Sequence, residues 1–176
     1  MCPRIMDAVA LAPADVLVAM KLVVHPERAG SVRQLGEELG MSKSAVAYSL
    51  NRLIALDLVK GEGGARRINK LALRDFLENG VRWIAPAKLG DFELGLPTAH
   101  SADVLAQNFV GDADPFVMPL AHGPMRGRAV SPLHPLAPKA AARDERLHRL
   151  LAVVDALRIG RARDRQAAAK ELRSWL

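Results

Sequence analysis

The chain has 176 residues and a formal net charge of +6, and half of its residues are hydrophobic. This length allows one ordinary domain, or a small domain with an extension, and the positive charge favours nucleic acid over a membrane as partner. The single cysteine, Cys2, excludes an internal disulfide. The sequence also lacks a signal-peptide pattern and an apolar run long enough to cross a bilayer, so we expect a cytoplasmic protein.

The first predicted element is a helix that begins at Pro13, after an N-terminal arm of residues 1–11. Proline suits the first turn of a helix, and the apolar residues that follow recur at helical spacing. His25-Pro26 is expected to end this helix, because the residue before a proline disfavours helical backbone. We expect the helix to pack on the elements that come next.

Residues 31–54 carry the pattern of two short helices joined by a tight turn. Ser31 and Gln34 have the spacing of a capping box, and Gly40 suits the left-handed end of the first helix. Ser42 can cap the second helix. The buried stripe predicted for this second helix consists of Val46, Leu50, Leu53 and Ile54. Two helices arranged in this way form a helix-turn-helix.

A β-hairpin is predicted directly after the second helix. Residues 58–60 and 65–68 can form its two strands, with the turn Gly61-Glu62-Gly63-Gly64 between them. A helix-turn-helix followed by such a wing resembles the winged helix-turn-helix of bacterial transcription regulators, of the MarR or ArsR kind. The resemblance covers residues 12–80 and implies a mainly α fold with a small hairpin, in the α+β class. We place this domain at residues 12–85.

In regulators of this kind the outer face of the second helix enters the major groove of DNA, and the wing can follow the phosphate backbone. Asparagine can bind adenine, arginine can bind guanine, and a helix N-terminus favours a phosphate. The other interpretation is an ordinary solvated helix face. The predicted DNA-contacting residues are Ser42, Lys43, Ser44, Ala47, Tyr48, Asn51 and Arg52 on the helix, and Lys60, Arg66 and Arg67 on the wing.

A further helix is predicted from Asn69 to Asn79-Gly80, and residues 81–84 are expected to form a short strand. Residues 86–138 hold eight of the eleven prolines. We therefore predict an ordered but irregular segment there, wrapping over the winged domain or a partner, with a short helix over residues 101–109. Its histidines, His100, His122 and His134, lack ligand spacing, so we predict no metal site, no cofactor and no enzymatic role.

Residues 139–176 are predicted to form a C-terminal unit of two helices, the first running from about Asp144 to Gly160. The apolar stripe of this first helix is interpreted as a dimer or partner interface, and it consists of Leu147, Leu150, Leu151, Val154 and Leu157. The unit has a charge surplus of +5, against +2 for residues 31–80, which a simple DNA-binding hypothesis does not explain. Phosphate contacts, contacts with an acidic protein and a solvated face all stay open for Arg158, Arg161, Arg163 and Arg165.

Together these patterns predict a sequence-specific DNA-binding transcriptional regulator. We expect a homodimer on a pseudo-palindromic operator, because one recognition helix contacts too few base pairs for selectivity. The alternative is an antitoxin or adaptor whose Pro-rich and C-terminal regions bind a toxin or enzyme. That architecture is similar to the antitoxins paired with nucleotidyltransferase-type toxins. RNA binding is disfavoured, because the seven aromatic residues are scattered along the chain.

Overall fold

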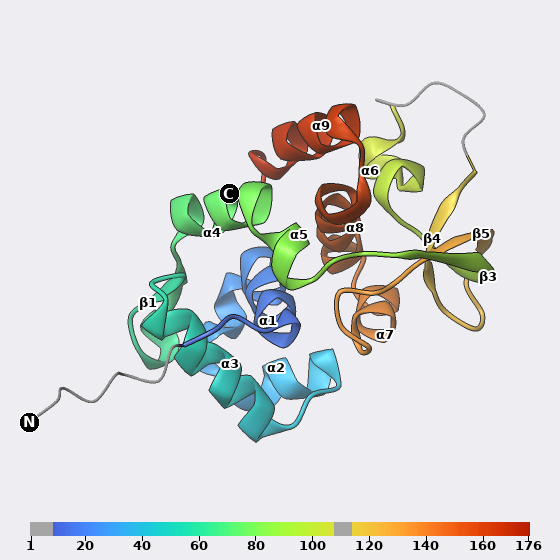
Figure 1. Ribbon diagram of the computed structural model, residues 1–176. Coiled ribbons are helices and arrows are strands. Elements are labelled where there is room, and N and C mark those ends of the chain that lie inside the picture. The colour runs from blue at the N-terminus through green and yellow to red at the C-terminus, as the bar shows by residue number, and fades with distance from the viewer. Residues whose placement is uncertain (1–8, 108–113) are drawn as a thin grey trace, which may run out of the picture.

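The computed structural model describes residues 9–107 and 114–176, and its fold is α+β and mainly helical, as predicted. Most of the predicted N-terminal arm, residues 1–11, lies outside the described ranges, and so does the end of the helix predicted over residues 101–109. Figure 1 shows the hairpin β1–β2 at one end of the molecule and the strands β3 to β5 at the other.

The N-terminal part has the helices and the hairpin in the predicted order. Ser31 Oγ accepts a hydrogen bond from the Gln34 backbone N–H, and Gly40 adopts the predicted left-handed conformation with φ of 71°. Ser42 Oγ accepts a hydrogen bond from the Ala45 backbone N–H at 3.1 Å. The elements are α1 (Pro13–Val24), the 3₁₀ helix η1 (Pro26–Gly30), α2 (Val32–Leu39), α3 (Lys43–Ala55), β1 (Val59–Lys60), η2 (Gly63–Ala65) and β2 (Arg67–Ile68).

The wing folds back onto the body of the winged domain. β1 and β2 pair antiparallel, with Val59 opposite Ile68. Between the two strands, η2 packs against η1. A Cβ added to Gly30 would lie 3.1 Å from Gly64 Cα, so the two backbones are in close contact. The tip of the wing is therefore supported by the domain itself.

The segment after the wing forms α4 (Lys70–Asn79) and α5 (Val81–Ile84). Asn69 precedes α4 as predicted, but its side chain donates to the backbone oxygen of Asp57 at 2.8 Å. The strand predicted over residues 81–84 is wrong, because this segment is helical. Val81 is buried, and α5 packs against α8 (Glu145–Ile159), so tertiary packing overrides the β-forming tendency of this apolar tetrapeptide.

Residues 86–138 contain a three-stranded β unit, so the prediction of an irregular segment is wrong. The strand β3 pairs antiparallel with β4 and with β5, and β4 and β5 run parallel to each other, which closes the unit into a small barrel. The elements of this segment are β3 (Leu89–Pro97), η3 (Ala99–Ser101), α6 (Asp103–Ala106), β4 (Phe116–Pro119) and β5 (Met125–Val130).

Glycines permit this tight closure. A Cβ on Gly95 would collide with the Met118 backbone oxygen, and one on Gly123 would collide with the backbone of Gly95. A Cβ on Gly127 would collide with the backbone oxygen of Pro115. Because glycine and proline are uncommon in ordinary strands, their abundance here conceals the strands from a sequence-based prediction.

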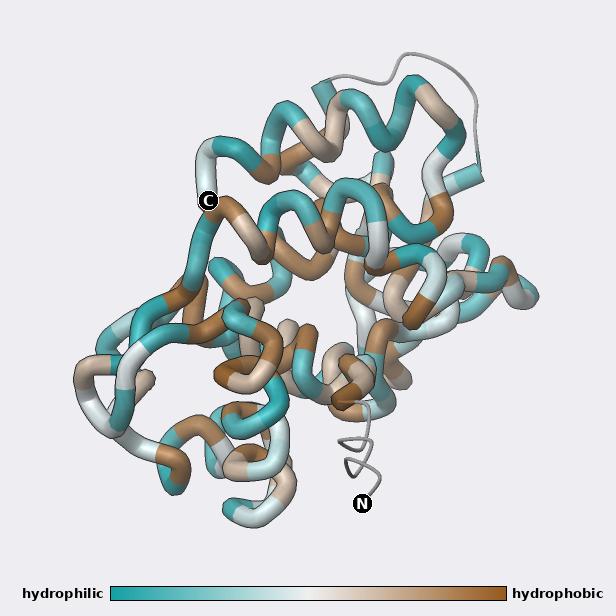
Figure 2. Tube along the Cα trace, turned by 60° about the vertical axis from the view of Figure 1, so that its left-hand side comes forward, coloured by the Kyte–Doolittle hydropathy of each residue, from teal (hydrophilic) through white to brown (hydrophobic). Residues whose placement is uncertain are grey.

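The C-terminal part consists of α7 (Ala137–Ala142), α8 and α9 (Ala162–Leu172), and α8 is the central helix of the fold. As predicted, α8 begins after Asp144, whose carboxylate accepts the Leu147 backbone N–H, and ends before Gly160. It packs against α1, α5, α6, α7 and α9 (Figure 1). Figure 2 shows the helices with hydrophobic residues on the sides turned toward one another.

The predicted interface stripe on α8 is wrong, because all of its residues are buried inside the chain itself. Residues 150–157 are buried without interruption, so this part of α8 is enclosed on every side. Its side chains belong to the same hydrophobic core as those of α1 and α3. The buried stripe residues are Leu147, Leu150, Leu151, Val154 and Leu157.

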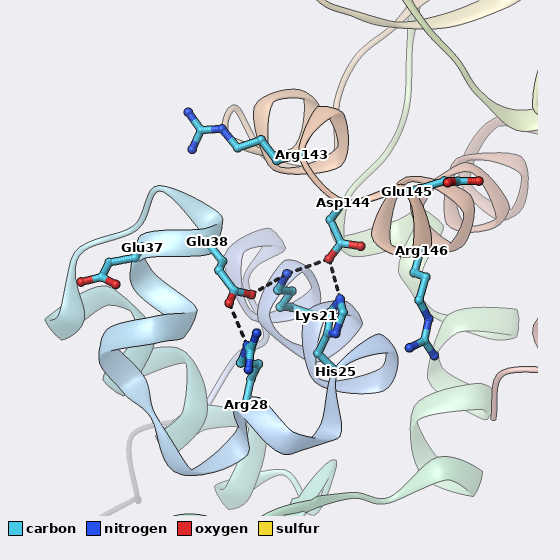
Figure 3. A pocket seen from close by; sticks show the side chains of 9 residues that line it. All are labelled: Lys21, His25, Arg28, Glu37, Glu38, Arg143, Asp144, Glu145 and Arg146. Atoms are coloured by element: carbon cyan, nitrogen blue, oxygen red, sulfur yellow. Dashed lines mark hydrogen bonds and ion pairs between the residues drawn. The ribbon is translucent and has the colours of Figure 1, made fainter.

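A partly buried ionic network also connects the helix-turn-helix to α8 (Figure 3). Lys21, which is 4 % exposed, lies 2.7 Å from Glu38 and 2.7 Å from Asp144. His25 Nε2 lies 2.8 Å from Asp144 Oδ2, and Arg28 Nε donates to Glu38 Oε1 at 2.8 Å. These residues line an open cavity of about 590 Å³. Since Asp144 also caps α8, the network fixes the start of that helix to α1 and α2.

The charges of this network shift the protonation of its two carboxyl groups. Partial burial by itself raises the pKa of Asp144 and of Glu38, but the hydrogen bonds and charge of Lys21 favour the ionised forms. The Leu147 N–H and His25 act in the same direction on Asp144, as Arg28 does on Glu38. The pKa of each carboxyl group is therefore lowered.

A second buried network joins α8 to the β unit. Thr98 Oγ1 donates to Asp155 Oδ2 at 2.7 Å, and Arg158 Nη1 lies 2.6 Å from Asp155 Oδ1. Arg158 also donates to the backbone oxygens of Ala85, at 2.7 Å, and Ser131, at 3.1 Å. Arg158 is therefore a buried structural residue, which excludes the solvated and phosphate-contacting interpretations for it.

Leu151→Ala should lower the free energy of unfolding by about 2–5 kcal/mol, because it leaves a cavity in the shared core. Urea unfolding followed by circular dichroism and tryptophan fluorescence should show one transition, since the winged part and the C-terminal part share that core. The exposed Leu71 of α4 provides the control, and Leu71→Ala should change the free energy by less than about 0.5 kcal/mol. Two separate transitions, of which Leu151→Ala moves one, would contradict a shared core.

The free energy of unfolding should fall as the pH is lowered below about 5. A carboxyl group whose pKa is lowered by folding stabilises the folded state above its ordinary pKa of about 4, and this contribution is lost as the pH falls through the folded value. Asp144→Asn keeps a side-chain oxygen for the α8 cap but removes the charge. It should reduce stability at pH 7 and give a shallower pH dependence in urea unfolding. Equal pH dependence in both proteins would show that Asp144 does not contribute.

Candidate nucleic-acid interface

The outer face of α3 presents most of the helix residues predicted to contact DNA. Val46, Leu50 and Leu53 are buried against the rest of the domain, as predicted. The opposite side of the helix faces solvent, where Tyr48 is 65 % exposed and Asn51 is also exposed. The remaining members of this outer face are Ser42, Lys43 and Ser44, which are exposed, and Ala47, which is partly exposed.

The first turn of α3 gathers polar groups suited to an anion. Ser42 Oγ caps the helix through the Ala45 N–H and lies 3.1 Å from Ser44 Oγ. The unpaired backbone N–H groups at a helix N-terminus and the helix dipole favour negative charge. Lys43 adds a full positive charge at the same end. This arrangement can bind a phosphate group while the residues one and two turns later contact base edges.

Arg52 does not belong to this exposed set. Its Nε donates to Asp15 Oδ2 at 2.8 Å and its Nη2 donates to Asp15 Oδ1 at 2.6 Å, and Asp15 is completely buried. Such a two-point pair occupies the donors that a guanine would need. The prediction that Arg52 contacts a base is therefore wrong. Arg52 instead fixes α3 to the first turn of α1.

Asp15 is a positioning residue that the sequence analysis missed. In addition to Arg52, its carboxylate accepts the Ala12 backbone N–H at 2.8 Å, so it also stabilises the start of α1. The sequence did contain an indication, because Asp15 is an acidic residue in the first turn of a helix whose next five residues are apolar. A charge placed beside such a stretch is buried only with a partner.

The wing contributes two of its three predicted residues to the surface. Lys60 and Arg67 are exposed, and Lys60 Nζ lies 3.5 Å from Asp57 in a solvent-exposed pair, which is weak. Arg66 is partly buried and donates from Nη1 to the Ala29 backbone oxygen at 3.1 Å. One donor of Arg66 thus holds the wing to η1, a structural role that the predicted DNA contact did not include.

A small cavity of about 280 Å³ lies at the base of the wing, beside η1 and the end of α1. Three of its lining residues, Arg66, Arg67 and Lys70, have positively charged side chains, and the other side chains are apolar. The sequence did not indicate this cavity, because its walls come from segments distant in the chain. The lining residues are Leu22, Val23, Pro26, Ala29, Arg66, Arg67, Ile68, Lys70 and Leu176.

Within residues 9–107 and 114–176, no group of three or more histidine, cysteine or acidic residues is arranged to hold a metal ion. No helix in the described part of the chain has the length and apolar composition to cross a membrane.

Comparison with known protein families gives a match to part of the chain. Residues 11–68, about a third of the sequence, match the model of the MarR family. No curated protein and no solved structure matched. The match ends with β2, so α4 and everything after it lie outside it. The family is one of regulators rather than enzymes. Residues 11–68, from the start of α1 to the end of the wing, are therefore a winged helix-turn-helix domain of the MarR family of transcriptional regulators.

Proposed function

We propose that this protein regulates transcription by binding a specific DNA sequence through the outer face of α3. The observation that supports this proposal is the solvent-facing set on α3 of a MarR-family domain. Asn51 can make two hydrogen bonds to adenine, and Ala47 can contact a thymine methyl group. Ser42, Lys43 and Ser44 contact phosphates at the start of the helix, and Tyr48 lies between these two groups on the same surface.

The wing supplies backbone contacts in this proposal. Lys60 and Arg67 are exposed cations at the hairpin, which can neutralise phosphates without distinguishing sequences. Arg66 is left out of the interface because it holds the wing against η1. Base selection is thus assigned to α3, and the wing adds affinity that depends on salt.

We further propose that two copies bind a pseudo-palindromic operator. One recognition helix contacts too few base pairs to select a site in a genome, and twofold DNA symmetry favours a homodimer. The apolar stripe of α8 is not the dimer contact, because it is buried. The same burial makes the stripe unavailable to a toxin or enzyme, so the alternative of an antitoxin or adaptor would have to use other surfaces of the Pro-rich and C-terminal regions.

Asn51→Ala should weaken binding to the preferred sequence by about 1–3 kcal/mol and relax base choice at one position. The preferred sequence is obtained by selection from a random DNA pool at about 150 mM salt, and affinity is then measured by fluorescence anisotropy. The control is Asn79→Ala, which removes an exposed asparagine on α4 and should leave affinity unchanged. An equal loss of affinity for preferred and random DNA from Asn51→Ala would rule out base contact by this residue.

Arg52→Ala should lower the free energy of unfolding by on the order of 3 kcal/mol, because Asp15 would be left buried without its charged partner. The double variant Asp15→Asn/Arg52→Gln removes both charges, so it should be less destabilised than Arg52→Ala. Thermal and urea unfolding measure both effects. If Arg52→Ala left stability unchanged and relaxed base choice at one position, Arg52 would be a DNA-contacting residue after all.

A further inference from the structure

An exposed surface on the β unit combines apolar and positively charged side chains. In the antiparallel pairing of β3 with β5, Phe92 lies opposite Arg128 and Leu94 lies opposite Arg126. Residues directly opposite each other in such a pair project from the same side of the sheet. These four residues therefore form one surface, which we call the β3–β5 face. The Arg128 guanidinium lies 5.8 Å from the centre of the Phe92 ring.

The apolar side chains of this face are unusually open to solvent. Phe92 is 43 % exposed and Leu94 is 48 % exposed. Further along the same side of β3, Leu96 lies opposite Met118 of β4, and Met118 is completely buried. The face is thus apolar along its length, but the protein's own core covers only its inner end. The outer end exposes large apolar side chains, and their contacts with water are unfavourable.

The charge on the face is positive, and no carboxylate in the described part of the chain neutralises it. Arg126 and Arg128 form no ion pair with any residue in the ranges 9–107 and 114–176. Glu93 alternates with Phe92 and Leu94 in the regular part of β3, opposite Gly127, so it projects from the other side of the sheet. The β3–β5 face therefore carries both apolar and basic side chains, and the Glu93 carboxylate does not lie on it.

We propose that the β3–β5 face binds a segment of a partner protein in which large apolar side chains are flanked by aspartate or glutamate. The apolar groups of the segment cover Phe92 and Leu94. Its carboxylates pair with Arg126 and Arg128. Charge complementarity of this kind selects the partner, and the apolar contacts supply affinity.

Three other occupants fit the face less well. Duplex DNA would neutralise the arginines but would leave Phe92 and Leu94 without apolar contacts. A second copy of this chain, related by a twofold axis, would place the arginines near their own copies. An anionic membrane would attract the arginines, but two are fewer than the cluster of about four to eight basic residues that typically binds anionic lipid. An acidic protein segment satisfies both kinds of side chain.

The position of the face makes it independent of the proposed DNA interface. Figure 1 shows β3 and β5 at the end of the molecule opposite to α3 and β1. A partner bound there leaves the outer face of α3 open, so one molecule can hold DNA and a protein partner together. The inference does not rest on the proposed function, because none of its residues lies in residues 11–68.

The test is selection of a displayed library of random short peptides on the full-length protein. Enriched peptides should combine large apolar residues with aspartate or glutamate. Fluorescence anisotropy with a selected peptide should show about tenfold weaker binding to Arg126→Glu/Arg128→Glu, and also to Phe92→Ser/Leu94→Ser. The matched control is Arg161→Glu/Arg163→Glu, which makes the same charge change at two exposed arginines at the start of α9 and should bind the peptide as the unaltered protein does.

Several results would overturn the proposal. These are enrichment of peptides without acidic residues, no enrichment at all, or an equal loss of binding in the α9 control. Direct binding of duplex DNA or of phosphatidylserine vesicles that depends on Arg126 and Arg128, without peptide binding, would assign the face to those partners instead. Circular dichroism checks that each variant is folded. Selection of DNA sequences should be unchanged in all three variants, which separates this result from the proposed function.

Discussion

The burial of α8 against α1 is the contact on which the rest of the structure depends. α8 is enclosed on all sides over residues 150–157, so it cannot keep its conformation in water without its neighbours. Its neighbours are α1 of the winged domain, α4 and α5 just after the wing, and η3, α6, α7 and α9 from the rest of the chain. The chain therefore folds around a helix from outside the MarR-family match, although the recognisable motif lies at the other end of the sequence.

α1 connects the two halves of the molecule through two buried charges. Asp15, in its first turn, holds Arg52 of α3, and Lys21, in its last turn, holds Asp144 at the start of α8. Because Asp15 and Lys21 lie in the first and last turns of the same helix, they hold α3 and α8 at fixed positions along α1. Paired charges cost desolvation energy, and removing one partner leaves the other buried and unpaired. The orientation of the proposed recognition helix is thus tied to the C-terminal half by ionic as well as apolar contacts.

The packing around α1 and α8 determines which side chains of α3, the β unit and α9 stay exposed. Asn51 and Tyr48 stay outside because the stripe of Val46, Leu50 and Leu53 turns inward. Phe92 and Leu94 stay outside because the small β barrel covers only the inner end of its apolar side. Arg161 and Arg163 are exposed at the start of α9, whereas Arg165 Nη1 donates to the Gly160 backbone oxygen at 2.7 Å. The basic surplus of the C-terminal unit is therefore only partly a surface charge.

The sequence by itself determined the winged part, because its features are local. Ser31, Gly40 and Ser42 mark helix ends through bonds within a few residues, and the inward stripe of α3 follows from helical periodicity. Only the tertiary structure decided what Arg52, Arg66 and the α8 stripe contact. The partners of the two arginines lie 37 residues away in the chain, so no local pattern indicates them. Periodicity shows which side of a helix is apolar, but it does not tell whether that side meets another chain or the protein's own core. The β unit was not predicted for a related reason. Its glycines are required by close contact with an opposing backbone, and that contact exists only in the folded structure.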